Sequence, residues 1–149
     1  MVDVCATYIE NREYVQPNHA NTLGTVHGGH ILKWMDTIGA MSAMRFAGKP
    51  CVTAHINQVD FDRPLEVGDI ALIEAYSYAA GRTSVRVRVR AAREDPLTGE
   101  SEATTESYWV FVAIDEDGRP SPVPDVTTSS ERGEQLRREA LEQETGEPA

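Results

Sequence analysis

The stretch from residue 18 to residue 48 constrains the fold more than any other part of the sequence. A polar, turn-prone segment leads into Gly28 and Gly29, and the residues that follow are typical of one helix that ends where Gly48 precedes Pro50. Large apolar side chains occur on nearly all sides of this helix: Ile31, Leu32, Trp34, Met35, Ile38, Met41, Met44 and Phe46. We therefore predict a helix that is enclosed on most sides, with the rest of the chain wrapped around it.

Four segments after the helix alternate apolar and polar residues, as strands do. They are Cys51–Asp62, Ile70–Ala79, Thr83–Arg93 and Ser101–Ile114, and short turns join them. A further strand is expected before the helix, over Val4–Val15. Because strands joined by short turns pair antiparallel, the pattern predicts an α+β fold in which an antiparallel sheet curls around a long helix.

The last part of the chain differs in composition. After a Pro-rich stretch, Ser130 can cap a charged helix over Glu131–Glu144, whose only large apolar residues are Leu136 and Leu141. We predict that this helix is exposed and weakly anchored. The chain then divides into one domain over residues 1–126 and a charged tail over residues 127–149.

Charge and cysteine content argue against several kinds of partner. The 14 Lys and Arg residues are outnumbered by 24 Asp and Glu residues, which gives a net charge of −10. This charge disfavours binding to nucleic acid or to an anionic membrane. Cys5 and Cys51 match no metal-ligand or redox spacing, and neither a signal peptide nor a membrane span is recognisable. We expect a cytoplasmic protein without a metal or another cofactor.

Asp36 is the one carboxylate within the apolar helix, so it is either satisfied structurally or used in chemistry. A structural role would be an ion pair with Lys33, one turn earlier. A chemical role is favoured because Gly29 and Ala40 lie on the same side of the helix and let a ligand approach the backbone. Gly28 and Gly29 also leave N–H groups free at the positive end of the helix dipole, where a carbonyl oxygen can be polarised. A carboxylate near such an oxyanion site is what acyl transfer to water requires.

Other reactive side chains have less specific surroundings. His27 and His30 match no zinc signature, and packing or capping at the helix start accounts for them. A stripe of alternating arginines could bind anions, but pairing with glutamates on neighbouring strands is the simpler interpretation. These arginines are Arg86, Arg88 and Arg90, and the glutamates are Glu74, Glu102 and Glu106.

Five segments match one known family in the right order. They are residues 19–36 (HANTLGTVHGGHILKWMD), 59–69 (VDFDRPLEVGD), 81–85 (GRTSV), 107–115 (SYWVFVAID) and 122–124 (PVP). Together they resemble the hotdog-fold acyl-CoA thioesterases, particularly the cytosolic (brain-type) acyl-CoA hydrolases and their bacterial relatives. The resemblance covers residues 5–126, and the charged C-terminal helix is similar to the family's tail. It implies a five-stranded sheet wrapped around the long helix, dimers with a continuous sheet, and hexamers built as trimers of dimers.

The resemblance also implies an active site between protomers, with the carboxylate at the Asp36 position as the catalytic group. Some two-domain relatives have an Asn directly before the Val-His-Gly-Gly stretch, which works with the Asp of the opposite hotdog unit, and this chain has Thr25 at that position. Thr25 and the nearby Asn21 are therefore alternative candidates for the residue that orients a water molecule. Arg82 and Thr83 are assigned to the CoA side of the substrate by the resemblance alone.

From these observations we expect an enzyme of fatty acid metabolism that hydrolyses fatty acyl-CoA to the free acid and CoA. The thioester carbonyl would face the amides of Gly28 and Gly29, and Asp36 of the same protomer would activate water as a general base. Direct attack by the carboxylate to form an anhydride is the competing route. The alternative function is a non-catalytic acyl-CoA sensor or binding subunit. An enoyl-CoA hydratase is disfavoured, because no Asp/His pair has the spacing of that family's motif.

Overall fold

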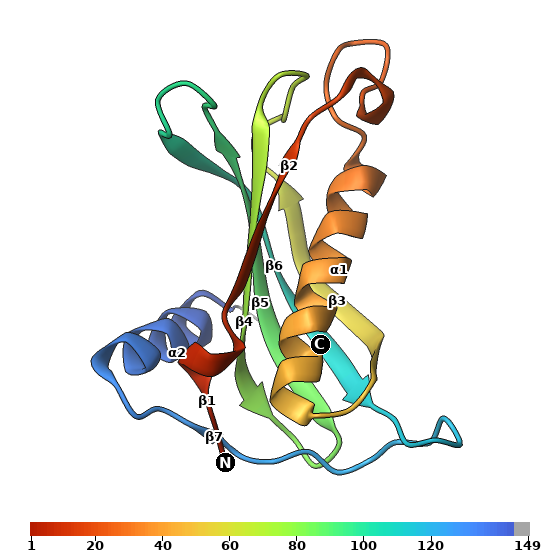
Figure 1. Cartoon of the computed structure of the whole chain (residues 1–149), viewed down its shortest axis with the longest axis vertical. Coiled ribbons are helices and arrows are strands. Elements are labelled where there is room, and N and C mark those ends of the chain that lie inside the picture. The colour runs from red at the N-terminus through yellow and green to blue at the C-terminus, as the bar shows by residue number, and fades with distance from the viewer. Residues whose placement is uncertain (145–149) are drawn as a thin grey trace.

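In the computed structural model, which describes residues 1–144, a five-stranded sheet wraps around one side of a long helix (Figure 1). The strands, in spatial order, are β2 (Ile9–Tyr14), β4 (Ile70–Ala80), β5 (Ser84–Glu94), β6 (Ser101–Ala113) and β3 (Cys51–Phe61), and all neighbours pair antiparallel. The long helix is α1 (Gly28–Ala47), and the C-terminal helix is α2 (Glu131–Gln143). Two-residue strands β1 (Val2–Asp3) and β7 (Val126–Thr127) form a separate parallel pair. The predicted fold class is confirmed.

Helix α1 packs tightly onto the concave face of the sheet. It ends at Gly48, whose φ of 69° is the left-handed conformation that glycine adopts at a helix C-terminus. Close approach depends on Gly39, because a Cβ there would lie 3.1 Å from Val89 and 3.3 Å from the Phe111 ring. The buried side chains of α1 and of the inward-facing strand positions form one continuous core.

The prediction that the helix is enclosed on most sides is wrong for the single chain. Met41 and Met44 keep 44% and 38% of their surface exposed, and Lys33 and Thr37 are exposed as well. The sheet covers only one side of α1, so its apolar residues exceed what one protomer can bury.

The N-terminal strand is shorter than predicted, because residues Val4–Thr7 form the 3₁₀ helix η1. The Asp3 carboxylate accepts the Cys5 N–H at 2.8 Å and so caps this turn. The buried Ser42 hydroxyl donates to the Thr7 carbonyl at 2.7 Å, which ties η1 to α1. A second 3₁₀ turn, η2 (Pro17–His19), follows β2.

Helix α2 is not weakly anchored, contrary to the prediction. Leu136 and Ala140 are only 5% and 0% exposed, and the Tyr76 hydroxyl donates to the Leu136 carbonyl at 2.6 Å. The platform for α2 is a group of tyrosines on the outer face of the sheet, on β4 and β6, which alternation along one strand does not reveal. Ser130 caps α2 as expected, by accepting the Gly133 N–H. Residues 145–149 of the predicted tail lie outside the described residues.

The arginines of the stripe form ion pairs with glutamates on the outer face of the sheet. Arg88 is nearly buried and forms an ion pair with Glu106, and Arg90 lies 3.9 Å from the same carboxylate. Arg86 pairs with Glu144. Of the expected partners Glu106 is confirmed, whereas Glu102 lies 3.8 Å from Arg63 instead.

The two edges of the sheet differ in character. Edge strand β2 carries a run of polar and charged residues at positions 10–13, which suits an edge that faces water. Edge strand β3 is long and exposes Val52 and Phe61, at 47% and 48%. An unpaired strand of this kind is a template for pairing with another chain. Across residues 1–144, no helix has the length and apolar character needed to span a membrane.

Candidate functional site

The segment before α1 is a folded loop whose polar residues bind one another. The Asn21 side-chain amide donates to Thr25 Oγ1 at 2.9 Å, and its carbonyl oxygen accepts the Leu23 N–H at 2.8 Å. The Val26 N–H donates to the Leu65 carbonyl at 2.8 Å and fixes the loop to the segment after β3. The structure thus brings Asn21 and Thr25, the two candidates for orienting water, together at the start of α1.

The start of α1 presents backbone donors in an open position. His27, at the N-cap, makes no side-chain hydrogen bond to the helix. The His30 N–H donates to the His27 carbonyl at 3.0 Å, whereas the N–H groups of Gly28 and Gly29 have no hydrogen-bond partner within residues 1–144. A Cβ at Gly29 would meet nothing within 4 Å, whereas one at Gly28 would lie 3.3 Å from Cζ of Phe61. The helix start can therefore receive a carbonyl oxygen at the positive end of the dipole.

Asp36 is half-buried and is held by a residue of β3. The Thr53 hydroxyl donates to Asp36 Oδ1 at 2.5 Å. The alternative ion pair with Lys33 is not formed, and no ion pair within residues 1–144 involves either residue. Asp36 therefore has a hydrogen-bond donor but no neutralising cation. Sequence reasoning missed Thr53, because the contact exists only once β3 folds back beside α1.

Asp36 and the helix start are well separated along α1 within one protomer. Eight residues at 1.5 Å per residue place Asp36 about 12 Å along the helix axis from Gly28. Reacting atoms must approach to about 3–3.5 Å. The helix rise therefore favours a carboxylate from a second protomer at the Gly28–Gly29 amides over the expected Asp36 of the same protomer.

Arg82 and Thr83 lie in the turn between β4 and β5, at the end of the sheet where α1 terminates (Figure 1). The Thr83 carbonyl accepts the Ala113 N–H at 3.0 Å, and the Arg82 carbonyl accepts the Val123 N–H at 2.9 Å. The Arg82 side chain is exposed. The structure does not bring these two residues to the start of α1.

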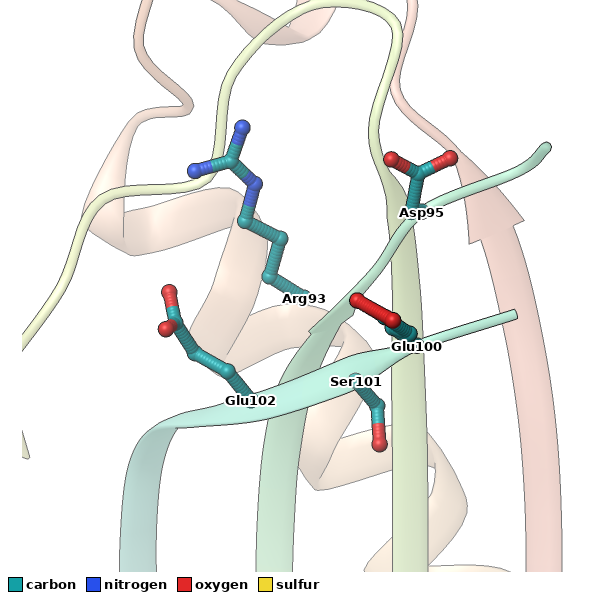
Figure 2. Close-up of a pocket in the computed structure, with 5 residues that line it drawn as sticks. All are labelled: Arg93, Asp95, Glu100, Ser101 and Glu102. Carbon is teal, nitrogen blue, oxygen red and sulfur yellow. The ribbon is translucent and has the colours of Figure 1, made fainter. Parts of the chain in front are cut away.

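Two hollows lie near the opposite end of the sheet. Figure 2 shows the hollow at the tip of the β5–β6 hairpin, which is lined by Arg93, Asp95, Glu100, Ser101 and Glu102. Its volume is about 300 Å³. Its charged side chains bind neighbouring residues: Arg93 pairs with Asp69 at 3.0 Å, and Asp95 accepts the Leu97 N–H at 2.7 Å.

No group of His, Cys, Asp or Glu residues in the described part of the chain could hold a metal ion.

The second hollow is an apolar slot of about 310 Å³ beside the start of α1. Thr25 and Gly28 lie at the slot, and its apolar side chains are Val26, Ile31, Phe61, Pro64 and Leu65. The slot therefore adjoins both the free amides of the helix start and the Asn21–Thr25 loop.

Comparison with known proteins agrees with the predicted family. The model of the thioesterase superfamily matches residues 23–100. An uncharacterised acyl-CoA thioester hydrolase of Bacillus subtilis, YkhA, is 34% identical over 86% of this chain and 74% of its own length. Acyl-coenzyme A thioesterase 11 of Mus musculus is 34% identical over 72% of this chain, which spans 18% of the mouse protein.

Solved structures give the same result. The acyl-CoA hydrolase of Staphylococcus aureus, in complex with butyryl coenzyme A, coenzyme A and coenzyme A disulfide, has a TM-score of 0.86 at 30% identity, over 94% of this chain and 85% of that one. An apo-hexameric acyl-CoA thioesterase has a TM-score of 0.86 at 37% identity, over 97% of this chain and 94% of that one. The matches do not single out the brain-type hydrolases, so that finer assignment stays a prediction. The chain belongs to the thioesterase superfamily.

Proposed function

We propose that the protein is an acyl-CoA thioesterase that hydrolyses acyl-CoA to the free acid and CoA at a site built from two protomers. The observation that carries the proposal is the pair of half-sites on one helix: within residues 1–144, the amides of Gly28 and Gly29 have no hydrogen-bond partner, and the Asp36 carboxylate forms no ion pair. The relatives named as acyl-CoA thioester hydrolases and acyl-CoA hydrolases support this substrate class.

The Staphylococcus aureus hydrolase supports the choice of residues. It has also been solved as three single-alanine variants, of an asparagine, an aspartate and a threonine. Along that chain the asparagine and the aspartate have the same separation as Asn21 and Asp36, and the aspartate and the threonine have the same separation as Asp36 and Thr53. We therefore assign the polar partner of Asp36 to Asn21 rather than Thr25, and we add Thr53 to the site.

Pairing of β3 with a second β3 explains how the half-sites meet. Thr53 holds Asp36 near one end of this strand, and the Phe61 ring touches Gly28 at the other end. Antiparallel pairing about a two-fold axis near Asn57, midway between them, places Thr53 of the partner subunit opposite Phe61. The partner's Asp36 then lies beside Gly28 of the first protomer. The separation between Asp36 and Gly28 along the helix of one protomer therefore does not prevent the two groups from acting on the same carbonyl.

Hydrolysis follows from this arrangement. The thioester oxygen accepts hydrogen bonds from the Gly28 and Gly29 amides, which stabilise the negative charge that develops on it. Asp36 takes a proton from a water molecule, whose oxygen attacks the carbonyl carbon. Asn21 has one side-chain N–H beyond the one bound to Thr25, and this donor can hold the water. Collapse of the tetrahedral intermediate breaks the carbon–sulfur bond, and the thiolate of CoA leaves and takes up the proton from Asp36.

Several further features belong to the same proposal. Arg82 and Thr83 would contact the CoA side of the substrate. The dimers would assemble further as trimers of dimers, as the hexameric state of a structural neighbour suggests. The enzyme would act in the cytoplasm, where its two free cysteines stay reduced.

The experiment that tests the proposal is release of free thiol from acyl-CoA by the purified protein, followed with a thiol reagent. Asp36→Asn keeps the shape of the side chain and removes its basicity, so we expect hydrolysis to fall by about 10²-fold or more. Asp117→Asn, at an exposed turn after β6 that does not line the apolar slot, is the matched control and should leave the rate unchanged. A protein that binds acyl-CoA and releases no thiol would be the sensor, and the proposal would fail.

A further inference from the structure

We propose that the apolar slot beside the start of α1 receives the acyl group of the substrate and that Phe61 determines which acyl chains are accepted. This inference rests on the proposed function and extends it from a reaction to a substrate class. The slot adjoins Gly28, whose N–H is one of the two donors for the thioester oxygen. An acyl group attached to a carbonyl at Gly28 meets this slot as the adjacent apolar surface.

The depth of the slot is limited by core residues. Ile31 and Leu65 are only 3% and 0% exposed, and both belong to the continuous core between α1 and the sheet. Residues packed this tightly do not move aside for a longer chain without cost. A volume of about 310 Å³ is at the small end of ligand pockets, which span about 300–1,000 Å³. The slot therefore suits short and medium acyl chains.

Phe61 is the largest apolar side chain of the slot, and it does not belong to the core. It is 48% exposed and lies at the end of β3. The far edge of its ring packs against Gly28, because a Cβ at that glycine would lie 3.3–3.7 Å from three ring atoms. The backbone direction is fixed by pairing with Thr105 and by the bond from the Asp62 N–H to the Thr104 carbonyl at 2.9 Å. A different side chain at position 61 would therefore point into the same space.

The test is the acyl-chain profile of kcat/KM on butyryl-, octanoyl- and palmitoyl-CoA for the wild type, Phe61→Ala and Phe61→Trp. Removing the ring widens the slot, so Phe61→Ala should raise the octanoyl-to-butyryl ratio by about 10-fold or more, while Phe61→Trp should lower it. Val67→Ala is the matched control, because Val67 is also exposed and follows β3 but does not line the slot. Sedimentation of each variant reports whether its assembly is unchanged.

Opposite shifts in the two Phe61 variants, with assembly intact, support the proposal, because a purely structural role would lower the rate for every chain alike. A uniform change for all three substrates would overturn it, since Phe61 would then contact a part of CoA common to them. The failure of the proposed function looks different: the wild type itself would release no thiol from any acyl-CoA.

Discussion

Two inactive variants of this protein should restore hydrolysis when they are mixed. Asp36→Ala removes the carboxylate and leaves Asn21, Gly28 and Gly29 intact, whereas Asn21→Ala does the reverse. In a two-fold dimer whose sites each combine the helix start of one protomer with the carboxylate of the other, the mixed dimer has one complete site and one site that lacks both groups. Random mixing makes about half of the dimers mixed, so the mixture should recover about a quarter of the wild-type rate per protomer.

The structural reason is the position of the two half-sites on one rigid element. Asn21 and Thr25 bind each other at the start of α1, while Asp36 binds Thr53 more than two helical turns away. No rotamer of Asp36 spans the separation of about 12 Å along the axis. The assay is thiol release against the fraction of mixed dimer, measured by native mass spectrometry with one variant carrying a mass tag, and the rate should rise in proportion to that fraction.

The matched control is the double variant Asn21→Ala/Asp36→Ala mixed with wild type. Its mixed dimers contain no complete site, so the rate should fall below that of simple dilution. A site contained within one protomer gives the opposite pair of results: the single variants do not complement each other, and the wild-type protomer stays active beside the double variant. That outcome would refute the geometric reasoning.

Two other predictions concern stability, and the first of them separates stability from activity. Gly29→Ala should raise the free energy of unfolding by up to about 1 kcal/mol, since alanine favours the helix and its Cβ meets nothing within 4 Å. The same substitution should lower kcat/KM, because the methyl group occupies the open approach to the amide. Thermal unfolding measures the first effect, and thiol release measures the second. Hydrogen bonds from the hydroxyl and N–H of Ser129 and the N–H of Cys5 lower the pKa of Asp3 below its usual 3.8. The stability that Asp3 contributes is therefore present above that pH and lost as the pH falls through the lowered pKa, so denaturant titrations should show Asp3→Asn less stable than wild type at pH 7 and the difference fading in acid.

The sheet could be predicted closely from the sequence because alternation reports directly which side chains face α1. The strand expected over Thr83–Arg93 is found over Ser84–Glu94, and its inward-facing valines are fully buried. Elements whose environment comes from several strands were not predictable in the same way. Leu136 looked like a poor anchor for α2 because its partners, Tyr76 and Tyr108, lie on two different strands and become a platform only in the folded sheet.

The residues of the candidate site also differ in how far the sequence could predict them. Gly28, Gly29 and Asp36 could be singled out because a helix places residues at known angles, and Asn21 followed from the family resemblance. Thr53 could not, since its contact with Asp36 depends on how β3 crosses the helix. The separation between the amides and the carboxylate could be calculated from the helix rise alone, although the sequence prediction assigned Asp36 of the same protomer to the amides.

In the proposed dimer, assembly and catalysis are coupled because they use the same surface. A single protomer leaves two features unsatisfied, the exposed methionines of α1 and the unpaired edge of β3. Asp36 and Thr53 join these two elements. A dimer that pairs β3 with β3 satisfies the edge and covers part of the helix, and in the same step it brings a carboxylate to the free amides of the other protomer. In this proposal, the dimerisation that buries the apolar helix also brings a water-activating group to the helix start, a combination that neither protomer provides alone.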